Sequence, residues 1–187
     1  MEFSRLLKDR RSIRDYTDEV PSLELVNEII RDTCLAPTAS NGQPCSFIII
    51  RDRDFIKALS DESKKNLLAA IESDPNSPLK IYQETLRDPG FNVFYNAPCL
   101  VVFVGPRRLH SLDVDCALTV AYFMFSAVSR GLGTCWVALG GNIRDKELLG
   151  RMSLREDHRI VAPIILGYPV EIPPASERHP PEILKVI

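Results

Sequence analysis

The sequence predicts a single domain in which helices pack around several buried strands. Four short stretches contain no charged residue, which is typical of strands that are buried on both faces of a sheet. These stretches are residues 46–50, 99–104, 134–138 and 160–168. Elsewhere, apolar side chains recur at helical spacing, which predicts amphipathic helices. A chain of 187 residues with a hydrophobic fraction of 45% is long enough to enclose one full core.

A helix without charged side chains lies at the centre of the segment 111–136. No charged residue occurs from Cys116 to Val128, so every face of this helix is apolar and needs to be buried. The uncharged run is too short to span a bilayer. A sheet can cover one side of the helix, and we expect a second copy of the chain to cover the other. Gly131 and Gly133 then end the helix.

The other helices follow in chain order. Ser22 is expected to cap a helix that Pro37 ends. Further helices are predicted over residues 3–7, 52–59, 63–72 and 142–152. Either Asp52 or Asp54 is expected to cap the helix that follows the first strand.

Two segments are expected to lie outside the core. Residues 73–91 are rich in proline and are predicted to form a surface excursion or lid, with a short helix over 79–87. The tail from residue 169 onward carries many prolines but is too apolar for a free end, so we expect it to lie along a subunit surface, its own or a partner's. Residues 1–187 show no repeat and no second domain, and we treat them as one domain.

Composition narrows the class of function. The net charge is only −2 at pH 7, so bulk charge predicts neither a nucleic-acid-binding protein nor a membrane-surface protein. The five cysteines are scattered without a CxxC pair and the histidines are not clustered, which argues against a structural zinc site or a disulfide framework. The first residues contain no apolar leader. We therefore expect a cytoplasmic protein without a metal.

A basic cluster ends the first helix and runs from Lys8 to Arg14, with Arg10, Arg11 and Ser12 between them. Two interpretations are open. Cations commonly occupy the last turn of a helix, where the helix dipole favours them. Guanidinium groups also match phosphate with paired, planar donors, and Ser12 adds a neutral donor to such an anion site.

A loop rich in small and amide side chains spans residues 36–44. Such a loop is either a plain connection or a polar cradle. Its polar residues are Thr38, Ser40, Asn41 and Gln43. They are able to hydrogen-bond a ligand that carries many hydroxyl groups and ring heteroatoms.

Four motifs occur in order along nearly the whole chain. They are RRSIR at 10–14, APTASNGQP at 36–44, GLGTCW at 131–136, and ILGYP at 165–169 followed by Arg178. In this order and at these separations, the chain resembles the FMN-dependent nitroreductase family. The resemblance implies an α+β fold with a central mixed, mostly antiparallel sheet flanked by helices. It also implies an intertwined homodimer with the long central helix at the interface and two FMN molecules held between the subunits.

The resemblance assigns the cofactor contacts by position. On one subunit, Arg10, Ser12 and Arg14 would hold the phosphate, ribityl chain and pyrimidine side of FMN, Arg11 lies in the same segment, and Arg178 would be a further phosphate ligand. The other subunit would contribute Thr38, Ser40, Asn41 and Gln43. Asn66 would lie at the pyrimidine edge of the flavin. The run Trp136, Val137, Ala138, Leu139 and Gly140 would pass the flavin ring, with a backbone N–H near Ala138 donating to flavin N5.

The resemblance also implies a reaction. The chain would be an enzyme whose chemistry is carried by FMN, without a catalytic side chain of its own. NAD(P)H would reduce the flavin in a ping-pong sequence, and a nitroaromatic, quinone or similar electron-poor acceptor would then take its place. Two alternatives stay open. One is a divergent flavin enzyme that performs reductive dehalogenation or oxidative chemistry, and the other is a non-enzymatic FMN carrier or sensor.

The chain departs from the family pattern at three places. Cys45 stands where relatives commonly have tryptophan, and it is either a small filler or a reactive thiol. The lysine of the tail motif is replaced by Ser176 or Glu177. The excursion at 73–91 has its own sequence, and because excursions at this place shape the substrate pocket, the natural acceptor is left open.

Overall fold

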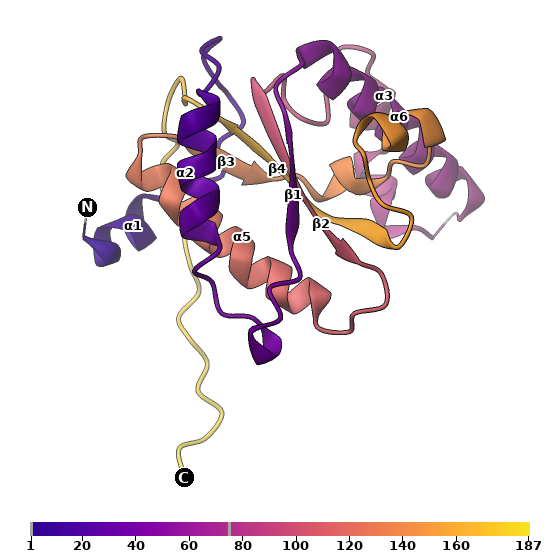
Figure 1. Ribbon diagram of the computed structural model, residues 1–187. Helices are drawn as coiled ribbons and strands as arrows, with labels where there is room; N and C mark the ends of the chain where they lie inside the picture. Colours follow the sequence, from indigo (N-terminus) through magenta and orange to yellow (C-terminus); the bar gives the residue numbers. More distant parts are fainter. Residues whose placement is uncertain (1, 75) are drawn as a thin grey trace.

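The protein, seen here in a computed structural model that describes residues 2–74 and 76–187, is organised around one four-stranded sheet (Figure 1). The strands are β1 (Ser46–Ile50), β2 (Cys99–Pro106), β3 (Gly133–Trp136) and β4 (His158–Gly167). Their order in the sheet is β1-β2-β4-β3, and each neighbouring pair is antiparallel. The expected α+β fold with a mostly antiparallel sheet is confirmed.

Helices cover both faces of this sheet. The α-helices are α1 (Phe3–Asp9), α2 (Leu23–Thr33), α3 (Arg53–Ser73), α4 (Gln83–Arg87), α5 (Leu112–Ser129) and α6 (Lys146–Arg151), and the 3-10 helices are η1 (Ala39–Asn41), η2 (Pro78–Tyr82) and η3 (Ala138–Gly141). Figure 1 shows α2 and α5 on one side of the sheet and α3 with α6 on the other. The short helix expected over 79–87 is present as η2 and α4.

The two helices predicted over 52–59 and 63–72 form one continuous helix, α3. Asp52 is its N-cap, since its side chain accepts a hydrogen bond from the N–H of Phe55. The polar residues at its middle do not interrupt it, because they face inward and bond to neighbouring segments. Ser60 accepts from the N–H of Val93, and Ser63 donates to the carbonyl of Leu139.

The alternation of side chains along β2 builds two cores. Leu100, Val102 and Val104 pack in the cluster under α3, whereas Cys99, Val101 and Phe103 pack in the cluster under α2 and α5. Because both faces of the strand are covered, neither set of alternate positions can carry a charge. The uncharged stretch 99–104 has this physical cause, whereas the equally uncharged β1 lies at the sheet edge and is fully buried only at Ile50.

Helix α5 is buried on one face by the sheet, as expected, and its opposite face is exposed in the single chain. Val120, Phe123 and Ala127 are in the core. On the opposite face, Val114 is 64% exposed and Leu118 is 42% exposed. By length and composition alone, the full helix Leu112–Ser129 is able to cross a membrane. The shorter uncharged run from Cys116 to Val128 is not. Its packing against the sheet and α2 is that of a core helix.

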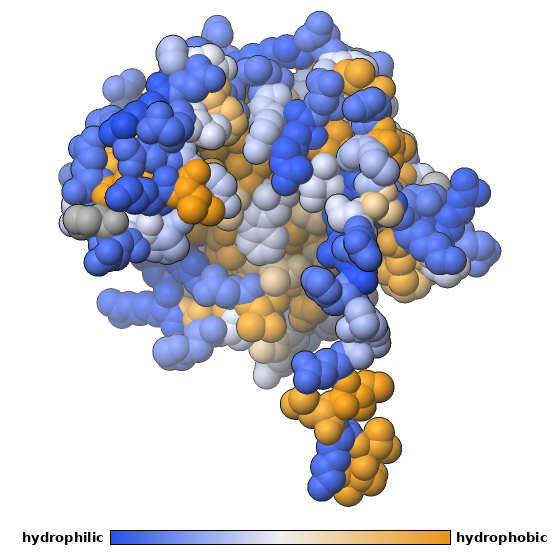
Figure 2. Space-filling model, turned by 180° about the vertical axis from the view of Figure 1, so that it is seen from behind, coloured by the Kyte–Doolittle hydropathy of each residue, from blue (hydrophilic) through white to orange (hydrophobic). Residues whose placement is uncertain are grey.

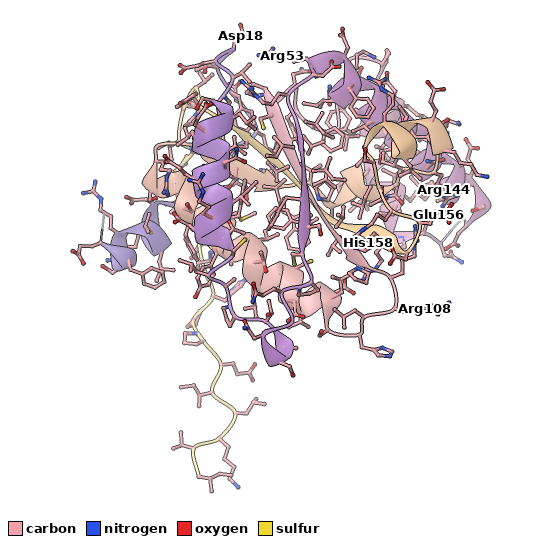
Figure 3. The ribbon with its side chains drawn as sticks, viewed as in Figure 1. Asp18, Arg53, Arg108, Arg144, Glu156 and His158 are labelled. Carbon is pink, nitrogen blue, oxygen red and sulfur yellow. The ribbon has the colours of Figure 1, made fainter. Side chains whose placement is uncertain are left out.

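The segment after α1 is docked on β3. Ser12 forms a parallel bridge with Thr134, and the N–H of Ile13 donates to the carbonyl of Thr134 at 3.0 Å. A side chain at Gly133 would begin 2.5 Å from the side chain of Ile13, so only glycine permits this approach. Further along the segment, Asp18 and Arg53 point toward each other and join it to the start of α3 with an N–O distance of 3.0 Å (Figure 3).

The tail beyond β4 runs past the N-terminal segment and then leaves the body of the protein (Figure 1). Its last residues are strongly exposed, and Leu184 and Ile187 are among them. Figure 2 shows these apolar side chains on a strip that projects from the rest of the surface.

Helix α3 holds the turn that follows β3. The Nδ2 group of Asn66 donates to the carbonyl of Asn142 at 2.8 Å and to Oε1 of Glu62 at 2.7 Å. The same oxygen of Glu62 accepts from the N–H of Asp145 at 3.1 Å. Glu62 is only 9% exposed, and burial alone would raise its pKa. Hydrogen bonds from Asn66, Lys65 and the Arg144 N–H outweigh burial and hold the pKa of Glu62 below its usual value.

We predict that Glu62→Gln lowers the free energy of unfolding at pH 7 by roughly 1–2 kcal/mol, because charge-assisted hydrogen bonds to a buried carboxylate are lost. Since the folded-state pKa of Glu62 is depressed, its contribution is complete above about pH 4.5 and declines as the pH falls below that value. Urea unfolding at pH 7 and at pH 3.5 checks this.

The difference between the wild type and Glu62→Gln should therefore shrink at the lower pH. Glu72→Gln is the matched control, because Glu72 is exposed on the same helix and should leave stability within about 0.5 kcal/mol of the wild type. An equal difference at both pH values would contradict the assignment.

Candidate functional site

A basic cavity of about 640 Å³ lies where the two ends of the chain meet. Its lining consists of Leu7, Lys8, Arg10, Arg11, Ser12, Arg14, Pro173, Pro174, Ala175, Ser176 and Arg178. The lining therefore holds four guanidinium groups and one ammonium group, and no carboxylate. Positive groups that converge without an acidic partner favour an anion, and guanidinium groups favour phosphate or carboxylate in particular.

Topology explains why these residues meet. Helix α1 ends at Asp9, and Arg10 begins the extended stretch that docks on β3. Strand β3 pairs with β4, and the chain leaves β4 at Gly167 close to the same stretch. The N–H of Thr17 donates to the carbonyl of Tyr168 at 2.9 Å, which fixes the start of the tail beside it. Arg178 is thereby carried to the cavity that Arg10 and Arg14 line.

The arginines of the cluster differ in how they are held. Arg11 is turned back on its own backbone, with Nη1 donating to the carbonyls of Lys8 and Arg10. Its Nε is buried and has no hydrogen-bond partner among the described residues. The Arg14 guanidinium lies 5.7 Å from the centre of the Tyr95 ring, within the range of a cation–π contact. Tyr95 in turn packs edge to face on Phe91, the last residue of the excursion.

The groups beneath the cluster are neutral. Burial raises the pKa of the Cys135 thiol, while Arg14, Ser12 and Arg10 act in the opposite direction, so the basic segment faces β3. Burial also raises the pKa of Tyr16, whose hydroxyl donates to the carbonyl of Ile13 at 2.7 Å. Neither Cys135 nor Tyr16 therefore supplies a negative charge to the cluster at neutral pH.

The run from Trp136 to Gly140 forms a turn with free donors at the end of β3. The N–H of Val137 donates to the carbonyl of Pro163, and the N–H of Gly140 donates to that of Val137, both at 2.9 Å. The N–H groups of Ala138 and Leu139, at the start of η3, have no backbone acceptor within residues 2–74 and 76–187. Trp136 is 37% exposed, so it is a surface residue at the strand end rather than a core residue.

The turn is held rigidly from below. A side chain at Gly140 would begin 2.2 Å from the ring of Phe94, so the backbone lies directly on this buried aromatic residue. Asn66 anchors the following residues, as described above, and both of its amide hydrogens are donated within the fold. Only the carbonyl oxygen of Asn66 is left for a ligand.

The polar loop is pre-shaped but lies apart from the basic cavity. Ser40, Asn41 and Gln43 have φ values of 50°, 54° and 44°, a left-handed conformation that non-glycine residues rarely adopt. The side chain of Thr38 accepts from the N–H of Gln43 at 3.0 Å, and Gln43 donates to Asn41 at 3.1 Å. Thr38 and Gln43 line a separate, smaller cavity of about 130 Å³.

Two polar lining residues, Lys8 and Ser176, were not among the predicted cofactor contacts, although Lys8 lies in the basic cluster of the sequence. Lys8 supplies a fifth positive group, and Ser176 a hydroxyl group. The sequence signal for Lys8 is its place next to the arginine cluster, one helical turn before Ser12. Ser176 could have been found from its distance of two residues from Arg178. The aromatic contact of Tyr95 with Arg14 has no sequence signal, since the two residues are brought together only by the fold.

Comparison with known proteins identifies the family. The model of the Nitroreductase family matches residues 7–168. The FMN reductase [NAD(P)H] of Bacillus subtilis is 28% identical over 191 residues, which cover 97% of this chain and 71% of that protein. A nitroreductase with bound FMN from Bacteroides fragilis superposes with a TM-score of 0.82 at 21% identity, covering 100% of this chain and 98% of the other.

A second solved structure, iodotyrosine deiodinase bound to FMN and 3-iodo-L-tyrosine, superposes with a TM-score of 0.77 at 18% identity and covers 100% of both chains. At such identities a structural likeness establishes the fold alone. The family match extends from the end of α1 to the end of β4 and includes the arginine cluster, the polar loop and the turn after β3. This chain belongs to the Nitroreductase family.

Proposed function

We propose that the chain is an FMN-binding oxidoreductase that uses NAD(P)H to reduce electron-poor acceptors such as nitroaromatics and quinones. The observation that carries this proposal is the basic cavity, in which four arginines from both ends of the chain converge without a carboxylate. Family membership and the name of the Bacillus subtilis relative support the choice of cofactor and co-substrate. The free thiols of its five cysteines suit a reducing cytoplasm.

The donor set of the cavity fits the phosphate and polyol of FMN. Arg10, Arg14 and Arg178 would hold the phosphate and the pyrimidine side, and Ser12 would bind a ribityl hydroxyl. The buried Nε of Arg11 is a donor that still needs an acceptor, which a ligand oxygen would supply. Lys8 also lines the cavity, and its positive charge would compensate for the tail lysine that Ser176 or Glu177 replaces in this chain.

The turn after β3 would present its backbone to the flavin ring. The N–H of Ala138, which has no backbone acceptor among the described residues, is the donor we assign to flavin N5, and Trp136 would lie beside the ring. Arg14 would hold a fixed positive charge near the pyrimidine edge and stabilise negative charge that develops there. Bound FMN would supply the hydride and electron chemistry, with NAD(P)H and the acceptor reacting in turn, so no catalytic side chain is needed.

We further propose that two copies of the chain complete each site. In one protomer the polar loop and the basic cavity are separate, so Thr38, Ser40, Asn41 and Gln43 would reach the cofactor of the partner. The outer face of α5 is apolar and exposed at Val114, Leu118 and Tyr122, one turn apart, and would bury against its twin. The apolar tail would lie on the partner's surface.

Anaerobic stopped-flow absorbance tests the reaction. The FMN-loaded protein should be reduced by NADH or NADPH within seconds and be reoxidised by a quinone or a nitroaromatic compound. Slow or absent reduction by both nucleotides would favour the FMN carrier over the reductase. A protein that takes up no FMN would contradict both.

We predict that Arg178→Ala weakens FMN binding by roughly 10-fold or more, because a charge-assisted contact to phosphate is lost. Riboflavin lacks the phosphate, so its affinity should be unchanged. Fluorescence titration with both flavins measures the two effects. Arg108→Ala is the control, because Arg108 is exposed on the loop after β2 and points outward (Figure 3). An equal loss for FMN and riboflavin would contradict the role given to Arg178.

We predict that Leu118→Glu converts the dimer to a monomer and lowers its FMN content, because a charge is placed in the apolar contact between two α5 helices. Sedimentation velocity and the flavin-to-protein absorbance ratio measure both changes. Ile81→Glu is the control, since Ile81 is 79% exposed on η2, which packs beside α3 and α4. A wild-type monomer, or an unchanged dimer in Leu118→Glu, would exclude this interface.

A further inference from the structure

Cys45 and Cys116 face each other across the junction between the polar loop and α5. Their Sγ atoms are 2.8 Å apart, although 71 residues separate them in sequence. This is shorter than an ordinary contact between two sulfur atoms and less than 1 Å longer than the ~2.05 Å of a disulfide bond. Cys116 is fully buried, whereas Cys45 is half-buried and lines the cavity of about 130 Å³ beneath the loop. Small molecules in that cavity can therefore reach Cys45.

The two sulfurs have different chemical characters. The hydrogen bond between them lowers the pKa of Cys45 and raises that of Cys116, so the proton stays on Cys116. Burial and the charge of Asp115 act against the lowering at Cys45. The half-buried sulfur that lines the cavity is thus the more nucleophilic one, and the buried sulfur is placed to resolve an adduct formed on it.

We propose that Cys45 and Cys116 are a redox-active pair that forms a reversible intramolecular disulfide on exposure to a peroxide. This inference does not rest on FMN or on the reductase reaction. Cys34 is not part of the proposed pair. It lines the same cavity but has no sulfur partner within hydrogen-bond distance among the described residues.

The reaction balances in two steps. The Cys45 thiolate attacks one oxygen of hydrogen peroxide, an S–O bond forms as the O–O bond breaks, and hydroxide leaves. The Cys116 sulfur then attacks the Cys45 sulfenic acid, an S–S bond forms as the S–O bond breaks, and the oxygen leaves as water with the Cys116 proton. The hydroxide takes up the proton that Cys45 lost on ionising, so two electrons pass from the sulfur pair to the peroxide and two molecules of water result. A small dithiol reverses the bond by exchange and is itself oxidised to its cyclic disulfide.

The disulfide would fix the polar loop to α5. In the thiol form the loop is held there by the Ala39 N–H, which donates to the buried carboxylate of Asp115 at 2.8 Å. A covalent link beside this hydrogen bond would close a ring of 71 residue steps and restrict the unfolded chain. We expect the melting temperature to rise by roughly 5–10 °C on oxidation and to return after reduction.

Thiol counting tests the proposal on the whole protein as purified. The protein is reduced with dithiothreitol, desalted, treated with a small excess of hydrogen peroxide, denatured and alkylated with iodoacetamide. Intact mass should show five alkylated cysteines before peroxide and three after it. Peptide mapping without reductant should show one linked pair that contains Cys45 and Cys116, and the melting temperature should rise as stated.

Two variants sharpen the result. Cys34→Ser should still form the link, and Cys45→Ser should keep all its remaining thiols open to alkylation after peroxide. Five alkylated thiols in the treated wild type, a link that includes Cys34, or a link between two chains would overturn the proposal. A correct link with an unchanged melting temperature would overturn the fixing of the loop.

Discussion

The close approach of Ile13 to Gly133 is the constraint on which the site depends. Because Gly133 has no side chain, the segment after α1 can lie directly on β3 and form its bridge to Thr134. The same contact sets the position of the arginine cluster and of the turn that follows β3. A larger residue at position 133 would push the arginine cluster away from β3 and from the turn that follows it, without touching any charged group.

The cavity gathers like charges, which costs free energy unless an anion is bound. The N-terminal segment, the turn after β3 and the tail are each held in place by their own contacts, so the repulsion does not displace them. The N-terminal side is held by backbone hydrogen bonds to β3 and β4, the turn is held by Glu62 and Asn66 of α3, and the tail is carried in from the end of β4. None of these three sets of contacts uses a cationic group of the cavity lining.

Much of the fold could be predicted from the sequence, because a strand covered on both faces has to lack charge and a helix between sheet and solvent has to be periodic. The prediction of two helices in place of α3 was wrong. The polar residues between them suggested a break, but Ser60 and Ser63 are buried and form hydrogen bonds inside the fold. The arginine cluster was visible as a local run. Its meeting with Arg178 followed only from resemblance, and the pairing of Cys45 with Cys116 across the fold left no local pattern at all.

The left-handed backbone of the polar loop has an energetic consequence. Ser40, Asn41 and Gln43 each hold a conformation that costs a non-glycine residue about 1 kcal/mol or more, so part of the folding free energy is invested there. Glycine at these positions would relieve the strain and remove the amide and hydroxyl groups together. At these loop positions, a substitution that raises thermal stability is therefore expected to weaken ligand recognition.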